Sequence, residues 1–409
     1  MRISFIIPSR NNLVYLKQAV QSIQRCYQDQ HDIVLLDDAS TDGTWEWISQ
    51  LQGDHFIKYR NPGPDRQGHT ILYDKGVELS RTEVFTIFHA DMVTTINHIP
   101  NLLKHLKPKV VVCATRIEPP LHPPGPEKLV RMFGFEPDQF DLDQFSLYVD
   151  EQEQINRDQT TEGIFAPWCM YKKDFQSIGG HDALFAPMEL EDSDLFNRMQ
   201  LVGYHLVQAR DSFVYHMTCR GSRFKQGIEI EAEIPLPDGS VWYKPKDSEE
   251  YLALRAIKVR EWRRKWGSDV MHDHYMKPIV PPKYNIGFCI NNCTFEVLRE
   301  LEPWCTDIYT DLASQQYLEQ EQPNTKFNLT KRVHNLSTAP NNDVVVHFDA
   351  SKLTTTSMQM LQNLALILQD SGAVGTFRLD IFTISVKQLV ELQPEFIYAS
   401  AILHHTSRG

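Results

Sequence analysis

Short apolar runs alternate with amphipathic segments along the first half of the chain. The runs Ile3–Ile7, Asp32–Leu36, Phe56–Tyr59, Val84–Phe88 and Val110–Ala114 predict strands, and the segments Leu13–Cys26, Asp42–Leu51 and Ile71–Leu79 predict helices. Strands that alternate with helices are typical of a mostly parallel, Rossmann-like sheet covered by helices. Such sheets bind ligands at the carboxyl ends of their strands. We therefore expect chemistry just past Ile7, Leu36 and Phe88.

The alternation of strand and helix patterns weakens after Val110–Ala114. Residues 115–165 are rich in Pro, Asp and Gln, which predicts a loop excursion over the active face. Regular structure resumes at Phe165–Tyr171, and a helix is predicted over Glu191–Leu201.

The C-terminal part of the chain predicts a second, smaller α/β domain. Its expected strands are Tyr284–Ile290, Thr306–Tyr309, Val344–Phe348 and Gly375–Ile381, with a helix at Ser357–Gln369. A helix at Glu249–Trp266 and three prolines between 278 and 282 precede it. The sequence thus predicts a first α/β domain over 1–225, a helical extension and Pro-rich linker over 226–283, and a smaller accessory α/β domain over 284–409.

The net charge of the chain limits the kinds of binding partner that are expected. The 409 residues contain 41 Lys and Arg against 53 Asp and Glu, a formal net charge of −12. A general nucleic-acid binder needs a basic footprint, so nucleic acid is not an expected partner. Six basic residues gather on the helix 249–266. They form either a solvated face over Trp262 and Trp266 or a patch for an anionic membrane or acidic partner.

The cysteines and the N-terminal residues indicate in which cellular compartment the protein is expected. There are seven cysteines, an odd number without a CxxC pair, which favours a reducing compartment. The first apolar run ends at Pro8, and a signal-peptide core needs about 7–15 apolar residues. We expect a cytoplasmic protein.

Two acidic clusters lie at predicted strand ends. Asp38, in the run Asp37–Thr44, could accept a hydrogen bond from a base or a ribose, or could belong to a plain turn with a helix N-cap. Asp91, in His89-Ala90-Asp91, could bind Mg²⁺ or Mn²⁺ as a hard oxygen ligand, or could cap a loop. His216, after another predicted strand, is a candidate ligand for the same cation.

A third cluster, Glu189–Asp194, precedes the helix 191–201. Acidic residues stabilise a helix N-terminus through its dipole, which accounts for the carboxylates without any function. Their mutual repulsion would also raise a pKa, as suits a general base.

Taken in order, these segments resemble the GT-A glycosyltransferases, especially the inverting family 2 enzymes. The resemblance rests on Phe5–Asn11, Val34–Gly43, Phe88–Asp91, Ile178–Asp182, Glu191–Leu195 and Val214–Ser222, and it covers about residues 1–225.

The resemblance implies a nucleoside-diphosphate sugar as donor, a divalent cation (Mn²⁺ or Mg²⁺) and transfer with inversion. Pro8, Ser9, Arg10 and Asp38 would line the nucleoside pocket, with His89 and Asp91 in the DxD position of the family. Asp91 and His216 would bind the metal, and Asp192 would be the general base. Glu191 and Asp194 would position the acceptor or the base, and Arg220 and Arg223 would clamp the diphosphate or be plain surface charges.

One departure from the family pattern matters. His89 replaces the first Asp of DxD, which could weaken metal dependence or alter donor choice. The segment Gly179–Asp182 with Glu191 and Asp192 is similar to galactosyl- and N-acetylgalactosaminyltransferases, so a UDP-sugar is favoured over a GDP-sugar.

Alternatives for the acceptor, for the function and for the C-terminal domain remain at this point. The acceptor could be a glycan, a lipid-linked glycan or a protein. A non-catalytic glycan-binding or scaffold protein on a degenerate GT-A fold is the second hypothesis for function. A sugar-nucleotide pyrophosphorylase is disfavoured, because no glycine follows the first strand. For residues 284–409 we favour a non-catalytic acceptor-binding or oligomerisation module over a second enzyme, since no Gly-rich turn follows Tyr284–Ile290.

Overall fold

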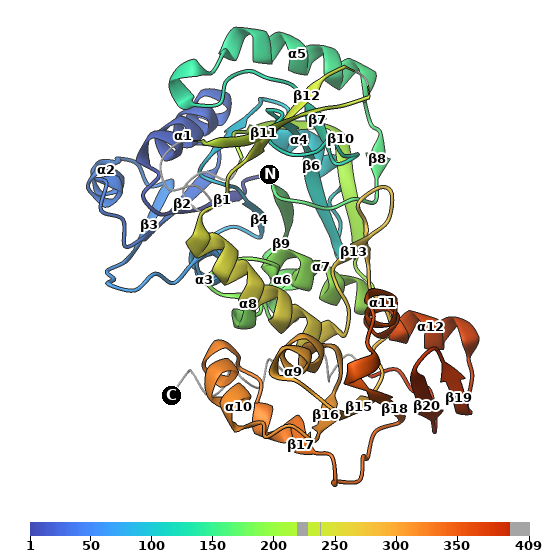
Figure 1. The fold of residues 1–409 in the computed structure, drawn as a ribbon. Helices are drawn as coiled ribbons and strands as arrows, with labels where there is room; N and C mark the ends of the chain where they lie inside the picture. Colours follow the sequence, from blue (N-terminus) through green and yellow to red (C-terminus); the bar gives the residue numbers. More distant parts are fainter. Residues whose placement is uncertain (219–227, 238, 393–409) are drawn as a thin grey trace. The chain divides into compact units, whose positions relative to one another are not determined.

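A computed structural model describes residues 1–218, 228–237 and 239–392 (Figure 1). The chain divides into two compact units. The first comprises residues 1–253 and 272–278, and the second comprises residues 254–271 and 279–409. Residues 226–283, the expected helical extension and linker, are divided between the two units.

The first unit is built on a large mixed sheet. Its strands are β1 (Ser4–Ser9), β2 (Asp32–Asp38), β3 (Phe56–Asn61), β4 (Val84–Ile87), β5 (Met92–Thr94), β6 (Val110–Glu118), β7 (Lys128–Val130), β8 (Thr160–Thr161), β9 (Trp168–Tyr171) and β10 (His205–His216). The order is β3-β2-β1-β4-β9-β6-β10-β5, with β7 beside β6 and β8 beside β10. β9 runs antiparallel to both of its neighbours, while β1 to β4 pair in parallel. The predicted α/β class with a mostly parallel sheet is confirmed.

Helices cover both faces of this sheet. They are α1 (Leu13–Tyr27), α2 (Thr44–Gln50), α3 (His69–Leu79), α4 (His98–His105), α5 (Leu142–Ile155), α6 (Lys172–Ser177) and α7 (Glu191–Leu201). One core cluster joins the sheet to α1, α2 and α4, and another joins it to α3, α6 and α7. The site is therefore set on a three-layer scaffold that is buried on both faces.

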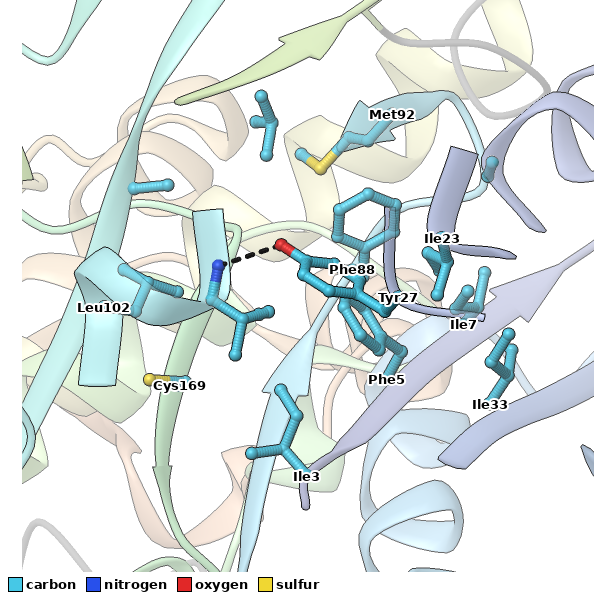
Figure 2. Close-up of a cluster of buried hydrophobic side chains, with 14 of the residues drawn as sticks. Ile3, Phe5, Ile7, Ile23, Tyr27, Ile33, Phe88, Met92, Leu102 and Cys169 are labelled. Atoms are coloured by element: carbon cyan, nitrogen blue, oxygen red, sulfur yellow. Dashed lines mark hydrogen bonds between the residues drawn. The ribbon is translucent and has the colours of Figure 1, made fainter. Parts of the chain in front are cut away.

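Strand alternation decides which residues enter each core. Phe5 and Ile7 of β1, with the preceding Ile3, pack with Ile23 and Tyr27 of α1 (Figure 2), whereas Ile6 packs into the opposite cluster. The buried Tyr27 hydroxyl accepts a hydrogen bond from the Ile99 backbone N–H at 3.1 Å, so it ties α1 to the start of α4.

The expected loop over 115–165 is wrong in part. β7 pairs with β6, and α5 packs Phe145 and Val149 into a third cluster. Asp141 caps α5 by accepting a hydrogen bond from the Gln144 backbone N–H. The polar composition of α5 reflects its exposed face, because its buried residues are few.

A hairpin of β11 (Ile230–Pro235) and β12 (Val241–Pro245) follows β10. The short strands β13 (Met271–His272) and β14 (Pro278–Ile279) form a separate pair. Helix α8 (Glu249–Trp266) contributes residues up to 253 to the first unit and the remainder to the second.

The second unit holds a six-stranded sheet of order β17-β16-β15-β18-β20-β19. Its strands are β15 (Ile286–Asn291), β16 (Asp307–Thr310), β17 (Val333–Asn335), β18 (Val344–Asp349), β19 (Gly375–Leu379) and β20 (Phe382–Val386), and its further helices are α9 (Phe295–Leu301), α10 (Gln315–Glu321), α11 (Thr355–Gln362) and α12 (Leu364–Ser371). The smaller α/β domain is confirmed. Two details differ: the helix predicted over 357–369 is two helices, and the strand predicted over 375–381 is the first arm of an antiparallel hairpin.

Several basic residues of α8 are buried, so they form neither the solvated face nor the surface patch that the sequence left open. Arg264 is fully buried and pairs with Glu302 at 2.7 Å and with Glu261 at 2.6 Å, and Arg260 pairs with Glu321 at 2.7 Å. Burial disfavours the charge of Glu302, but Arg332 and Arg264 outweigh this and lower its pKa to about 2. An unpaired buried charge would be costly, so these ion pairs stabilise the interior of the second unit.

Glu302→Gln is expected to lower the free energy of unfolding by about 3–5 kcal/mol, since it leaves two arginines facing a neutral amide. Urea denaturation of the full chain would measure this. Glu300→Gln is the matched control, because Glu300 is 48% exposed and its pair with Arg263 is 3.9 Å long. Equal stability of the two variants would contradict the buried network.

None of the helices in the described part of the chain combines the length and the apolar character that a membrane span requires.

Candidate active site

A cavity of about 380 Å³ opens in the first unit where β1, β2, β4 and β10 end. Ten of the predicted site residues were expected to meet around a ligand, and the cavity brings nine of these together: Pro8, Ser9, Arg10, Asp38, His89, Asp91, Glu191, Asp192 and His216. Asp194 is the exception. Arg220 and Arg223 lie outside the described residues.

The β1–β2 end of the cavity is tied together by hydrogen bonds. Arg10 donates from Nη1 to the Asp38 carbonyl at 2.6 Å. The Asp38 carboxylate accepts hydrogen bonds from the Asn61 side chain and from the backbone N–H groups of Gln67 and Gly68, all at 2.8–2.9 Å. A carboxylate has about four acceptor positions, so one remains for a ligand. Asp38 therefore holds the loop after β3 in place as well as lining the pocket.

That loop, residues 61–68, brings Arg66 into the cavity wall. Arg66 Nε is buried without a hydrogen bond, and burial lowers the pKa of the guanidinium. Gly68 has a φ of +83°, and a Cβ there would lie 2.0 Å from the Pro187 carbonyl oxygen. The loop is thus packed tightly against the segment that precedes α7, and only glycine fits at its last position.

His89, Asp91 and His216 form a candidate metal site. Their potential ligand atoms all lie within 4.8 Å of one another, which no other group of three or more such residues achieves in the described part of the chain. His216 Nε2 lies 3.5 Å from His89 Nδ1 and 3.5 Å from Asp91 Oδ1. Burial and the neighbouring charge of His216 lower the pKa of His89 to about 4, so this ring is neutral at pH 7 and keeps a lone pair for a cation.

A carboxylate behind the cluster orients His216. His216 Nδ1 lies 2.8 Å from Glu118 Oε1, at the end of β6. Glu118 is buried and flanked by Arg116 at 3.3 Å and Lys128 at 3.2 Å. A carboxylate on the far nitrogen directs the other nitrogen of an imidazole toward a metal. Burial alone would lower the pKa of His216, but Asp91 and Glu118 raise it to about 9.

Helix α7 brings two further carboxylates to the cavity lining. Glu189 and Leu190 have φ values of +84° and +68°, a left-handed turn that starts the helix with Glu191 and Asp192 facing the cavity. Glu191 Oε1 pairs with His69 Nε2 at 2.7 Å. Asp192 lies 3.6 Å from His181 Nε2, and its side chain is 30% exposed.

Asp194 points away from the cavity. It is fully buried and accepts a hydrogen bond from Arg198 Nε at 2.8 Å. Arg198 in turn donates to the carbonyls of Ile178 and Gly180. Asp194 therefore braces the turn before His181 and cannot contact an acceptor from this position.

Residues 4–176 match the family described as Glycosyl transferase family 2. This part of the chain, under half of its length, is similar to the family 2 glycosyltransferases. A curated relative is dolichol-phosphate mannosyltransferase from Pyrococcus furiosus, 28% identical over 108 residues. That match covers 26% of this chain and 30% of the relative, so the chain spans under a third of the relative's length.

Two solved structures overlap with about half of the chain. The mannosyltransferase PcManGT from Pyrobaculum calidifontis, in complex with GDP-Man and Mn²⁺, gives a TM-score of 0.38 at 16% identity and covers 54% of this chain and 57% of its own. Residues 1–349 of TarS from S. aureus give a TM-score of 0.38 at 12% identity and cover 53% of this chain and 60% of their own.

One electrostatic expectation about the site is wrong. Repulsion among the carboxylates of 189–194 was expected to raise the pKa of Asp192. Burial does act in that direction, but the facing His181 imidazole outweighs it and holds the pKa of Asp192 below its usual value. The neighbouring carboxylates are themselves paired, Glu191 with His69 and Asp194 with Arg198, so their repulsion is largely cancelled.

The part of the chain that matches the family model also contains site residues that the sequence reasoning missed. Arg66 follows β3, and Glu118 is the last residue of β6, so both obey the rule for strand ends that pointed to Asp38 and Asp91. His69 and Tyr73 lie on α3 and carry no such signal. Tyr73 stacks on His89 with ring centroids 6.5 Å apart and lies 5.6 Å from His181.

Proposed function

We propose that this protein transfers a sugar from a nucleoside-diphosphate sugar to an acceptor hydroxyl, with inversion at the anomeric carbon and with Asp192 as the general base. The observation that carries the proposal is the single cavity that places the Asp91 cluster on one wall and Asp192 on another. A single displacement needs this arrangement, because the leaving diphosphate must be stabilised while the attacking hydroxyl loses its proton.

In this proposal, separate groups of residues bind the nucleoside and accept the proton of the acceptor. Pro8, Ser9, Arg10 and Arg66 form the nucleoside end of the cavity with Asp38, and Ser9 Oγ and Arg66 Nε are buried without hydrogen bonds. Buried polar atoms of this kind are usually satisfied, so a bound ligand is their natural partner. Asp192 accepts the proton of the acceptor hydroxyl as that oxygen bonds to the anomeric carbon.

The donor set favours Mn²⁺ over Mg²⁺. Two imidazoles and one carboxylate would hold the ion, and Mg²⁺ prefers oxygen ligands and retains water. A bound cation would neutralise charge on the departing diphosphate. His89 lies within this ligand set, so its replacement of an Asp is no longer an argument for the degenerate binding protein.

Glu118→Gln is expected to weaken Mn²⁺ binding by about tenfold, because the amide leaves His216 less firmly oriented and less basic. Isothermal titration with Mn²⁺ measures the effect. Glu127→Gln is the matched control, since Glu127 faces the same Arg116 and Lys128 but does not contact His216. Equal losses in the two variants would contradict the role of Glu118.

A donor panel tests the proposed function directly. UDP-sugars are placed first on the likeness to galactosyl- and N-acetylgalactosaminyltransferases, and GDP-mannose is included because the curated relative is a mannosyltransferase. A donor at about 100 times its Kd stabilises the folded state by about 2.7 kcal/mol. We expect thermal stabilisation and slow hydrolysis of one donor, both dependent on Mn²⁺. No response to any donor, with the fold intact, would overturn the proposal.

The acceptor class, the cytoplasmic location and the accessory role of the second unit remain parts of this proposal. The six cysteines in the described residues are all free thiols, which supports a reducing compartment.

A further inference from the structure

Behind Asp192 lies a histidine that has a carboxylate on each side. His181 Nδ1 lies 2.8 Å from Asp74 Oδ1, on α3, and His181 Nε2 lies 3.6 Å from Asp192 Oδ1, on α7. The His181 side chain is fully buried, while Asp74 is 35% exposed and Asp192 is 30% exposed. The three side chains come from three different segments and form a line that ends at the cavity.

The backbone around His181 is built for this contact. The His181 N–H also donates to the Asp74 carboxylate, at 3.2 Å to each oxygen. Gly180 has a φ of +70°, and a Cβ there would lie 2.3 Å from Asp74 Oδ2. Asp74 can approach His181 this closely only because residue 180 has no side chain.

The two atoms between His181 and Asp192 have no other partner. His181 Nε2 and Asp192 Oδ1 are both buried without a hydrogen bond to any described residue. The rings of Tyr73, Trp168 and Phe175 surround the imidazole, and Nε2 makes no hydrogen bond to any of them. A small rotation of either side chain would close the 3.6 Å gap to a charge-assisted hydrogen bond.

We propose that His181 is a positioning residue for the general base: Asp74 holds its imidazole, and the imidazole holds Oδ1 of Asp192, which leaves Oδ2 free for the acceptor hydroxyl. This inference rests on the proposed function. In the reaction, the acceptor O–H bond breaks and its proton passes to Asp192 Oδ2, while the acceptor oxygen bonds to the anomeric carbon and the nucleoside diphosphate leaves. His181 keeps its proton throughout, and Asp192 later returns its proton to water.

The charges around the pair set a pH dependence. His181 faces Asp74 and Asp192, and Asp192 faces His181, His69 and His89. Burial alone would lower the pKa of His181, but the two carboxylates raise it to about 9. His181 is therefore charged at neutral pH, and this charge keeps Asp192 ionised as the pH falls.

The test compares His181→Phe and His181→Gln with the wild type, using the donor that responds in the panel and water as the acceptor. We expect kcat to fall about 100-fold in His181→Phe and less in His181→Gln, because a displaced base loses reaction geometry. The KM for the donor should stay within about twofold. The acidic limb of the pH profile should move to higher pH in both variants, since Asp192 loses its positive neighbour.

His205→Gln, at an exposed position at the start of β10, is the matched control. A kcat within about threefold of wild type and an unmoved pH profile in His181→Phe would overturn the inference. So would a loss that appears equally in the donor KM and in thermal stability, because His181 would then be structural only. Failure of the proposed function itself is distinguishable, since the wild-type protein would then neither bind nor hydrolyse any donor.

Discussion

Asp192→Asn is expected to lower the rate of sugar transfer by about 10²–10⁴-fold and to leave donor binding within about twofold. The amide has nearly the same shape but cannot accept the proton of the acceptor hydroxyl, and general base catalysis typically contributes a factor of this size. Donor binding should be spared because the proposed nucleoside contacts are made by other residues that line the cavity, Pro8, Asp38 and Arg66. Steady-state transfer or donor hydrolysis gives kcat, and calorimetry gives the donor Kd.

Glu78→Gln serves as the control for a lost carboxylate, because Glu78 is 67% exposed and pairs only with Lys75 among the described residues. Its kcat should equal that of the wild type. Full turnover by Asp192→Asn would reject Asp192 as the base, and a parallel loss of donor binding would show that it holds the donor instead.

Asp91→Ala is expected to weaken Mn²⁺-supported donor binding by at least about 100-fold. Loss of an outer carboxylate such as Glu118 costs about 10–100-fold in metal affinity, and Asp91 is the one anionic ligand in the cluster itself. Donor titrations with and without Mn²⁺ would separate donor binding that depends on the metal from donor binding that does not.

Asp91→Asn provides the comparison for Asp91→Ala, since it keeps an oxygen ligand without the charge and should lose less. Donor binding that is unchanged in Asp91→Ala, or that depends equally on Mn²⁺ in all forms, would remove Asp91 from the metal site.

The parts of the site that follow a strand could be predicted from the sequence. Asp38, Asp91 and His216 each end or follow a buried run, and the parallel sheet alone brings such positions to one edge. The same rule covers Glu118, but the prolines that follow it made residues 115–165 look like a plain loop. Composition concealed α5 in the same way, because only one stripe of that helix is apolar.

Contacts between helices could not be predicted in this way. Asp74 and His181 are separated by 107 residues, and neither follows a strand of the sheet. Their meeting depends on how α3 packs and on the absence of a side chain at Gly180. The pKa of Asp192 was mispredicted for the same reason, since its direction is set by His181 rather than by its neighbours in sequence.

Helix α3 links every part of the site that was described separately. The residue before it, Gly68, binds Asp38; His69 pairs with Glu191; Tyr73 stacks on His89; and Asp74 holds His181. An engineer who exchanged residues 61–68 for the loop of another transferase, in order to change the sugar nucleotide, would displace the start of this helix. Donor choice and base alignment are therefore expected to evolve together, and a successful transplant would have to carry α3 with the loop.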